Sequence, residues 1–490
     1  MNNHNNTSAP RDAQWREELR QRLTAKERTA IPRVRMPELP ADYRRHSLVH
    51  EVNQGLSAEA AVLEASRCLD CPDPQCVTGC PVSINIPGFI KNIEQEDFVA
   101  AAKVLKETSA LPAVCGRVCP QEKQCESRCI YNKMKREPVA IGYLERFAAD
   151  TQLNSETVVL PDMEPANGKK IAVVGSGPCS LSFAGEMARL GYDVTVYEAL
   201  HQLGGVLKYG IPEYRLPNSV VQAEIDALSS MGVKFVTDTV IGKTLGYEDL
   251  KSLGYKGVFV ASGAGLPRFM GIPGENFIGV SSSNEYLTRI NLMGAGQPGH
   301  DTPVHRGKRV AVIGGGNTAM DSVRTALRMG AEHAWIVYRR SEAEMPARVE
   351  EVKHAKEEGV EFLTLHNPVE YLADENGRVR AMRLQRMELG EPDESGRRSP
   401  VPVEGDIVEV EVDQVIVSVG VSPNPLVPNA IPSLEISRRG TIVVDEASMQ
   451  SSISDIYAGG DIVRGGATVI LAMGDGRRAA KGMHESLKNS

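Results

Sequence analysis

The chain has 490 residues, of which 41% are hydrophobic and 24% are charged, and its formal net charge is −8. This length allows about two to four domains. The negative charge argues against a nucleic-acid binder, which needs a dominant basic face, and no apolar run is long enough for a membrane-spanning helix.

The N-terminal segment is rich in charges of both signs. Because the first ten residues lack an apolar signal core and transit peptides are poor in acids, the sequence predicts a cytoplasmic protein. We expect a solvated helix followed by a strap that is punctuated by Pro32, Pro37 and Pro40. Residues 11–45 contain ten Lys and Arg, interleaved with Asp12, Glu17, Glu18, Glu27, Glu38 and Asp42.

Eight of the nine cysteines fall between Cys68 and Cys129, in two runs. Iron–sulfur clusters are bound by thiolates that converge from such short runs, so the pattern predicts two [4Fe–4S] clusters. A cysteine before proline ligates the other cluster in bacterial ferredoxins, which suggests that Cys80 reaches the second run. The runs are Cys68-x2-Cys71-x4-Cys76-x3-Cys80-Pro81 and Cys115-x3-Cys119-Pro120-x4-Cys125-x3-Cys129.

Two other interpretations of the cysteines stay open. Structural zinc commonly uses paired C-x2-4-C motifs, often with histidine, whereas no histidine lies between His50 and His201. Disulfides need an oxidising compartment, for which the N-terminus offers no signal. Iron–sulfur clusters therefore fit the spacing best.

A dinucleotide-binding pattern begins at residue 169. An apolar strand runs into the turn Gly175-Ser176-Gly177-Pro178, and a helix follows over residues 181–190. The next strand, Asp193 to Tyr197, ends at Glu198. The glycines let the backbone approach a pyrophosphate at a helix N-terminus, and the acid accepts bonds from a ribose. Ser180 replaces the third glycine, a mild departure.

The pattern recurs further along the chain. A strand from Lys308 leads into the turn Gly314-Gly315-Gly316-Asn317-Thr318, followed by a helix over residues 320–329. The strand over residues 334–338 ends at Arg339-Arg340 instead of an acid. Arginines suit the 2′-phosphate of NADP, so this site is predicted to bind NADPH. The alternative is a solvated end of a strand, and nothing in the sequence distinguishes Arg348 from a surface charge.

Two Rossmann-like units in series, one nested inside the other, predict an α/β flavin reductase that uses FAD and a nicotinamide. Gly204-Gly205, Gly460-Asp461 and a helix from Thr468 to Leu487 are expected to complete the FAD site, with the helix N-terminus stabilising anionic flavin. The strands that begin at Val258 and Val415 mark where the chain leaves and re-enters this domain. The expected domains are a helical iron–sulfur domain (1–165), the FAD domain (166–295 and 417–490) and the NADPH domain (296–416).

These motifs, in this order, resemble the glutamate synthase small (beta) subunit family. The family includes the large subunit of NADH-dependent ferredoxin:NADP oxidoreductase, sulfide dehydrogenase-type subunits and the N-terminal half of dihydropyrimidine dehydrogenase. The resemblance runs from about residue 35 to the C-terminus. It is carried by the two cysteine runs, by Gly204-Gly205-Val-Leu-Lys-Tyr-Gly-Ile-Pro212 and by Gly316-Asn-Thr-Ala-Met-Asp321.

The resemblance implies a ligand set that differs from a simple count of cysteines. It implies that one cluster is held by Cys68, Cys71, Cys76 and Cys129. It implies that the other is held by Cys80, Cys119 and Cys125, with Glu145 as the fourth ligand. Cys115 would then be a bystander, and Cys115 and Glu145 compete for one position, for which we favour Glu145. Cys179 has no partner cysteine nearby and is expected to be a small packed residue.

The predicted function is transfer of electrons from NADPH through FAD and the clusters to a partner. No protein acid or base is needed, because the cofactors carry the chemistry. The resemblance implies a large subunit with a second flavin that makes glutamate from 2-oxoglutarate and glutamine.

The alternatives are electron bifurcation and a sulfide dehydrogenase; the run Ile84 to Ile90 weakly favours them. A thioredoxin reductase-type enzyme lacks its C-x-x-C, since no cysteine follows Cys179, and a non-catalytic iron–sulfur scaffold would not respond to NADPH.

Overall fold

The computed structural model describes residues 9–155, 160–394 and 396–488, and its first part is a helical domain. Side-chain caps set where these helices begin: Thr24 and Glu27 form a capping box, and Asn85 and Asp97 each accept a hydrogen bond from the third residue of the following helix. The elements are α1 (Gln14–Arg22), α2 (Ala25–Ala30), α3 (Ala41–Arg44), α4 (Ala58–Ala65), α5 (Gln75–Thr78), α6 (Ile86–Glu94), α7 (Phe98–Lys106), α8 (Pro112–Val118), η1 (Gln121–Lys123), η2 (Glu126–Arg128), α9 (Ile130–Lys133) and α10 (Ile141–Leu153).

The basic N-terminal segment is more deeply packed than the expected solvated helix and strap. Arg16, Arg28 and Arg44 are each at most 4% exposed. Arg16 pairs with Asp70, and Arg28 pairs with Glu94 at 2.8 Å. The expectation of a solvated segment is therefore wrong at these positions. The arginines are buried because they pair with buried carboxylates that lie far from them in the sequence.

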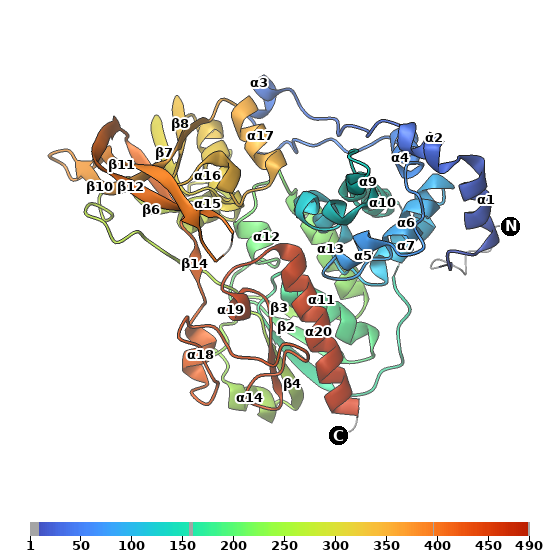
Figure 1. Cartoon of the computed structure of the whole chain (residues 1–490). Helices are drawn as coiled ribbons and strands as arrows, with labels where there is room; N and C mark the ends of the chain where they lie inside the picture. Colours follow the sequence, from blue (N-terminus) through green and yellow to red (C-terminus); the bar gives the residue numbers. More distant parts are fainter. Residues whose placement is uncertain (1–8, 156–159, 395, 489–490) are drawn as a thin grey trace.

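A five-stranded parallel sheet follows the helical domain. Four consecutive buried apolar residues in β1, from Ile171 to Val174, place this strand in the interior, as expected for a sheet covered on both faces. In spatial order the strands are β15 (Ile456–Ala458), β4 (Tyr255–Val260), β1 (Lys170–Val174), β2 (Asp193–Tyr197) and β3 (Lys234–Val236). The associated helices are α11 (Pro178–Arg189), α12 (Val206–Tyr209), α13 (Asn218–Ser230), α14 (Tyr247–Ser252), α18 (Leu426–Ala430), α19 (Asp461–Arg464) and α20 (Val469–Lys488) (Figure 1).

A second five-stranded parallel sheet repeats this plan. Its strands are, in spatial order, β6 (Val280–Ser282), β13 (Gln414–Val417), β7 (Arg309–Ile313), β8 (His333–Tyr338) and β9 (Glu361–Thr364). Its helices are α15 (Ser283–Asn291), α16 (Asn317–Arg328), η3 (Glu342–Glu344) and α17 (Val349–Glu357). An antiparallel sheet of β10 (His366–Ala373), β11 (Val379–Pro392) and β12 (Arg398–Glu411) extends from it (Figure 1).

Two passages of chain connect the sheets. They pair with each other as the antiparallel strands β5 (Leu266–Pro267) and β14 (Val421–Ser422). At β5 the chain leaves the first α/β unit, and at β14 it returns to it. The second sheet begins with β6, which pairs with β13, so it starts before the boundary expected at residue 295. The two α/β units with a helical N-terminal domain agree with the expected α/β fold class.

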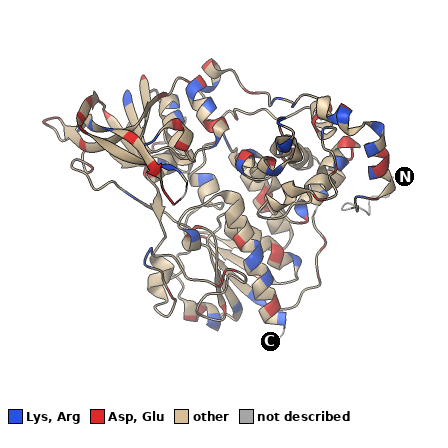
Figure 2. Ribbon diagram, in the orientation of Figure 1, with Lys and Arg blue, Asp and Glu red and all other residues tan. Residues whose placement is uncertain are grey.

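The helical domain and the first sheet share one hydrophobic core. A single cluster of buried side chains extends from Phe89 and Cys115 of the helical domain to Phe183 of α11 and Met473 of α20. These parts therefore form one packed body, whereas the second sheet has a core of its own. Charges of both signs are interspersed over the ribbon (Figure 2). Among the described residues, no helix is both long enough and apolar enough to cross a membrane.

Candidate functional site

The first glycine-rich turn lies where β1 ends and α11 begins. Gly175 has φ +92°, and a Cβ atom there would lie 2.7 Å from the carbonyl oxygen of Ala261, so only glycine fits. A Cβ atom on Gly177 would meet no described atom within 4 Å, which leaves open space at the helix N-terminus that Pro178 begins. The arrangement fits a pyrophosphate group.

Glu198 holds this turn in place from the end of β2. Its Oε2 accepts a hydrogen bond from the backbone N–H of Ser176 at 2.9 Å, and its Oε1 accepts one from Leu200 at 2.9 Å. The Ser176 hydroxyl also accepts from the backbone N–H of Gly204 at 3.0 Å. Gly205 has φ +54° and approaches Gly177 closely, so the predicted glycine pair packs on the turn.

The C-terminal part of the chain contributes Gly460, Asp461 and Thr468 next to the first sheet. Gly460 has φ +73° and follows β15, and Asp461 accepts from the backbone N–H of Ala467 at 2.9 Å. Thr468 accepts a hydrogen bond from Leu471 in the first turn of α20. Sequence reasoning missed Asp475 of α20, which is fully buried and accepts from the backbone N–H of Gly460 at 3.1 Å. Its signal was a carboxylate between two glycines, Gly474 and Gly476.

The second turn repeats the first in the other sheet. The N–H of Gly314 donates to Val337 at 2.9 Å, as that of Gly175 donates to Tyr197 at 2.8 Å. A Cβ atom on Gly314 would lie 2.3 Å from the carbonyl oxygen of Ser418, and one on Gly316 would meet no described atom within 4 Å. Asn317 and Thr318 are the first residues of α16. This turn also fits a phosphate-bearing ligand.

The two arginines after β8 lie in different surroundings. Arg339 is exposed. Arg340 is 6% exposed, forms an ion pair with Asp393 at 2.5 Å and donates to the carbonyl of Arg398 at 2.8 Å. A guanidinium engaged in this way already has partners, so Arg339 is the better candidate for a 2′-phosphate and Arg340 stabilises the loop between β11 and β12.

The cysteines separate into two groups. In the first group, Cys76 interacts electrostatically with Cys68, Cys71 and Cys129, and burial raises the pKa of Cys68 to about 11. Lys91 donates to the Cys68 carbonyl at 2.7 Å. The geometry brings together the four thiols that the resemblance implies for one cluster.

The second group contains Cys80, Cys119, Cys125 and Glu145, together with Cys115. Glu145 is 5% exposed and its Oε1 has no hydrogen-bond partner among the described residues. Burial raises the pKa of Glu145 to about 8. A buried carboxylate without a partner is costly unless it is neutral or coordinates a cation, so Glu145 fits a metal ligand.

Cys115 interacts with Cys119, Glu145 and Cys80 of the second group. A hydrogen bond with Cys119 and burial both raise the pKa of the Cys115 thiol. Its Sγ also lies 3.4 Å from Sδ of Met473 in α20, and it is fully buried. Burial in turn raises the pKa of Cys80 to about 11. A cluster would lower these pKa values, because coordination deprotonates a thiol.

The second group lies against the C-terminal helix of the first sheet. Arg477 of α20 donates to the carbonyl of Val82 at 2.6 Å, and a Cβ atom on Gly474 would lie 3.0 Å from the carbonyl of Pro81. Pro81 follows Cys80 directly. The predicted flavin site and the second group therefore meet across one helix.

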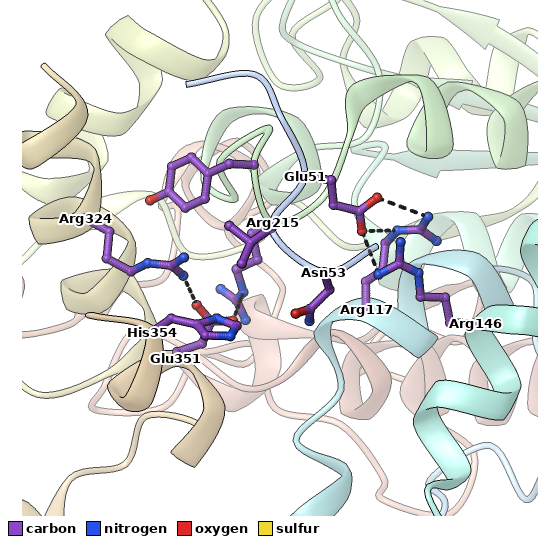
Figure 3. Close-up of a pocket in the computed structure, with 10 residues that line it drawn as sticks. Glu51, Asn53, Arg117, Arg146, Arg215, Arg324, Glu351 and His354 are labelled. Atoms are coloured by element: carbon purple, nitrogen blue, oxygen red, sulfur yellow. Dashed lines mark hydrogen bonds and ion pairs between the residues drawn. The ribbon is translucent and has the colours of Figure 1, made fainter. Parts of the chain in front are cut away.

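A small pocket lies where the helical domain and both sheets meet (Figure 3). On one side Glu51 faces Arg117, at 2.9 Å, and Arg146, at 3.0 Å. On the other side Glu351 faces Arg215, at 3.2 Å, and Arg324. The pocket is an ionic joint between domains, because each of its four arginines already has a carboxylate partner.

Two family models match the chain. Residues 44–157 match the model described as dihydropyrimidine dehydrogenase domain II, 4Fe-4S cluster. Residues 150–476 match the pyridine nucleotide-disulphide oxidoreductase model. Together these matches cover the two cysteine groups and both glycine-rich turns.

Three relatives show how far the likeness extends. The chain is 37% identical to the glutamate synthase [NADPH] small chain of Escherichia coli, over 92% of this chain and 97% of that protein. It is 36% identical to the same subunit of Azospirillum brasilense, over 93% of this chain and 95% of that protein. It is 38% identical to the NADPH-Fe(3+) oxidoreductase subunit beta of Geobacter sulfurreducens, over 85% of this chain but 64% of that protein.

Among solved structures, FprA of Mycobacterium tuberculosis in complex with NADPH is similar in fold. The TM-score is 0.55, the sequence identity is 21%, and the match covers 66% of this chain and 85% of that one. This likeness supports the nested arrangement of the two α/β units.

Proposed function

This chain belongs to the glutamate synthase small-chain family of NADPH-dependent oxidoreductases, and we propose that it passes electrons from NADPH through FAD and two [4Fe–4S] clusters to a partner subunit. The cofactor types follow from the family models that match its two parts. The number of clusters, the order of the cofactors and the identity of the partner are the proposed elements.

The contact between the second cysteine group and α20 carries the proposal. Electron transfer between a flavin and a cluster needs both to approach one another, and Cys115, Pro81 and Val82 all touch residues 473–477 of α20. Because the helical domain and the first sheet share one core, this contact is fixed by packing.

The two turns have separate tasks in this scheme. In this proposal Gly175, Gly177 and Glu198 bind the pyrophosphate and ribose of FAD. Oε2 of Glu198 already accepts from both the N–H and the hydroxyl of Ser176, whereas Oε1 accepts one bond, from Leu200, and retains a lone pair for the ribose. In the same proposal Gly314, Gly316 and Arg339 bind NADPH. When bound, FAD supplies the conversion of a two-electron hydride transfer into single-electron steps.

The partner is a large subunit that carries a second flavin and makes glutamate from 2-oxoglutarate and glutamine. The near-complete overlap with the small chains of two glutamate synthases supports this choice. The Geobacter relative, of which this chain spans 64%, keeps a different acceptor open within the family.

The test is an anaerobic stopped-flow experiment on the purified holoprotein. NADPH should bleach the flavin absorbance first, and the broad absorbance of the clusters should then fall. A flavin that bleaches while every cluster stays oxidised would contradict the electron path. Affinity purification of the native complex tests the partner: recovery of a subunit without amidotransferase activity would contradict the glutamate synthase assignment.

A further inference from the structure

A short segment, residues 346–349, connects the second glycine-rich turn to the second cysteine group. We call this segment the strut. At one end, the backbone N–H of Ala347 donates to the carbonyl of Gly315 at 3.2 Å. The backbone N–H of Arg348 donates to Oδ1 of Asn317 at 2.8 Å. The strut is thus hydrogen-bonded to the turn proposed to hold the NADPH phosphates.

At its other end the strut contacts every residue of η1, which lies between Cys119 and Cys125. Gln121 accepts from Nη2 of Arg348 at 3.0 Å, and Lys123 donates to the carbonyls of the strut at 2.9 and 3.2 Å. Glu122 accepts from the backbone N–H of Val349 at 3.4 Å. Gln121 also donates to the carbonyl of Cys115 at 3.2 Å, which extends the chain of bonds into α8.

Arg348 is the central residue of the strut. Its side chain is 6% exposed, donates to the carbonyl of Arg117 at 2.8 Å and pairs with Glu350 at 2.9 Å. Because these charge-assisted bonds hold the guanidinium to fixed partners, a movement of the strut moves η1 and α8 as well, unless the bonds break. The geometry therefore defines a continuous path from the Gly315–Asn317 turn to the loop of the second cysteine group.

We propose that the strut couples nucleotide occupancy of the second turn to the redox state of the centre held by the second cysteine group, with Arg348 as the positioning residue. The inference rests on the proposed function. A phosphate bound at the N-terminus of α16 pulls on Gly315 and Asn317, and the strut carries this shift to η1. In the reverse direction, reduction adds negative charge at the second cysteine group and displaces η1. The same hydrogen bonds then displace the second glycine-rich turn.

Coupling between two sites is reciprocal, so it can be measured from the nucleotide side. The experiment measures the dissociation constant of 2′,5′-ADP, which carries the 2′-phosphate but cannot accept a hydride from reduced FAD, by calorimetry, for the holoprotein as oxidised and after reduction by dithionite. The wild-type ratio of the two constants should be about fivefold or more. In Arg348→Gln the ratio should move clearly toward one, since glutamine cannot bridge Arg117 and Gln121 together.

The matched control is Lys353→Gln, which changes an exposed cation of α17, the helix that begins directly after Arg348; Lys353 pairs with Glu38 instead of η1. This variant should keep the wild-type ratio. Flavin reduction contributes to the ratio in wild type and in both variants alike, so a change confined to Arg348→Gln is the part that the strut carries. Hydrogen exchange gives a second readout: 2′,5′-ADP should change the protection of residues 119–125 in wild type but not in Arg348→Gln. If Arg348→Gln does not retain its cofactors, Arg348→Lys, which keeps the charge but not the fork, takes its place.

The outcomes separate the two proposals. Equal ratios in wild type and the Arg348 variant overturn the strut, although 2′,5′-ADP binds. Loss of 2′,5′-ADP binding in every form, wild type included, overturns the proposed function and the strut with it. A diminished ratio confined to the Arg348 variant supports the coupling.

Discussion

The thiol of Cys115 lies 3.4 Å from the thioether sulfur of Met473, so the second cysteine run directly touches the C-terminal helix. Cys115 is thereby engaged on the side of α20, whereas Glu145 has a carboxylate oxygen with no partner among the described residues. This difference supports the proposal that Glu145 is the cluster ligand and that Cys115 packs against α20.

The first prediction concerns the iron content. Two [4Fe–4S] clusters contain about eight iron atoms. Glu145→Ala should reduce this toward about four, because the second cluster would lose one of its four proposed protein ligands, whereas Cys115→Ala should keep about eight. Iron analysis and EPR of the reduced protein measure both. The assignment is wrong if Cys115→Ala loses a cluster and Glu145→Ala keeps both.

The second prediction separates the two arginines after β8. Arg339→Gln should raise the KM for NADPH by about tenfold to a hundredfold and leave that for NADH nearly unchanged, because a charged hydrogen bond to the 2′-phosphate contributes about 1.5–3 kcal/mol. Arg340→Gln should instead lower thermal stability, because it breaks the pair with Asp393. Steady-state kinetics with both nucleotides decides, and equal KM changes for NADPH and NADH would remove Arg339 from the phosphate site.

The third prediction concerns pH and Glu224. Glu224 is 1% exposed, accepts from the backbone N–H of Ala113 at 2.8 Å, and burial raises its pKa to about 7. The folded state therefore holds a proton that the unfolded state releases near pH 4.5. The stability from this proton is full below about pH 4.5 and is lost as the pH rises through about 7.

The variant Glu224→Gln tests this sign. It should be more stable than wild type at pH 8, by up to about 3 kcal/mol, and the difference should shrink on going to pH 5. Glutamine keeps an oxygen for the N–H of Ala113, so the packing of α8 is retained. Thermal denaturation at several pH values measures the difference, and a gain that does not depend on pH would contradict the assigned pKa.

The fourth prediction concerns the ionic joint. Arg215 pairs with Asp321 at 2.8 Å and with Glu351 at 3.2 Å, and all three are buried. Arg215→Met should destabilise the second sheet and its helices by about 3–5 kcal/mol, because it leaves buried carboxylates without their partner. The fluorescence of Trp335 in β8 reports unfolding of this part.

Two further variants serve as controls for Arg215→Met. Arg383→Gln removes an exposed pair with Glu370 on the antiparallel sheet and should cost less than about 1 kcal/mol. Combining Arg215→Met with Asp321→Asn should recover part of the loss, since one uncompensated charge is removed. Similar losses for Arg215→Met and Arg383→Gln would show that the joint contributes no more than a surface pair.

Several features were predictable because they depend on local patterns. The strand Asp193–Tyr197 and the C-terminal helix were predicted within a residue or two. Both depend on the local pattern of apolar residues, which has a different period in strands and in helices. Arg348 was not distinguishable from a surface charge, and Asp475 was missed. Both act through partners that are distant in sequence, Arg117 and Gln121 in one case and Gly460 in the other.

By itself, the sequence determined the chemistry: spaced thiols indicate clusters, and two glycine-rich turns after apolar strands indicate two nucleotide sites. The tertiary structure alone decided how these parts meet. Contacts such as Cys115 with Met473, and Arg348 with Gln121, join residues hundreds of positions apart, and a local pattern carries no information about such partners. Packing of the shared core brings them together, because apolar surfaces of the helical domain and the first sheet are buried against each other.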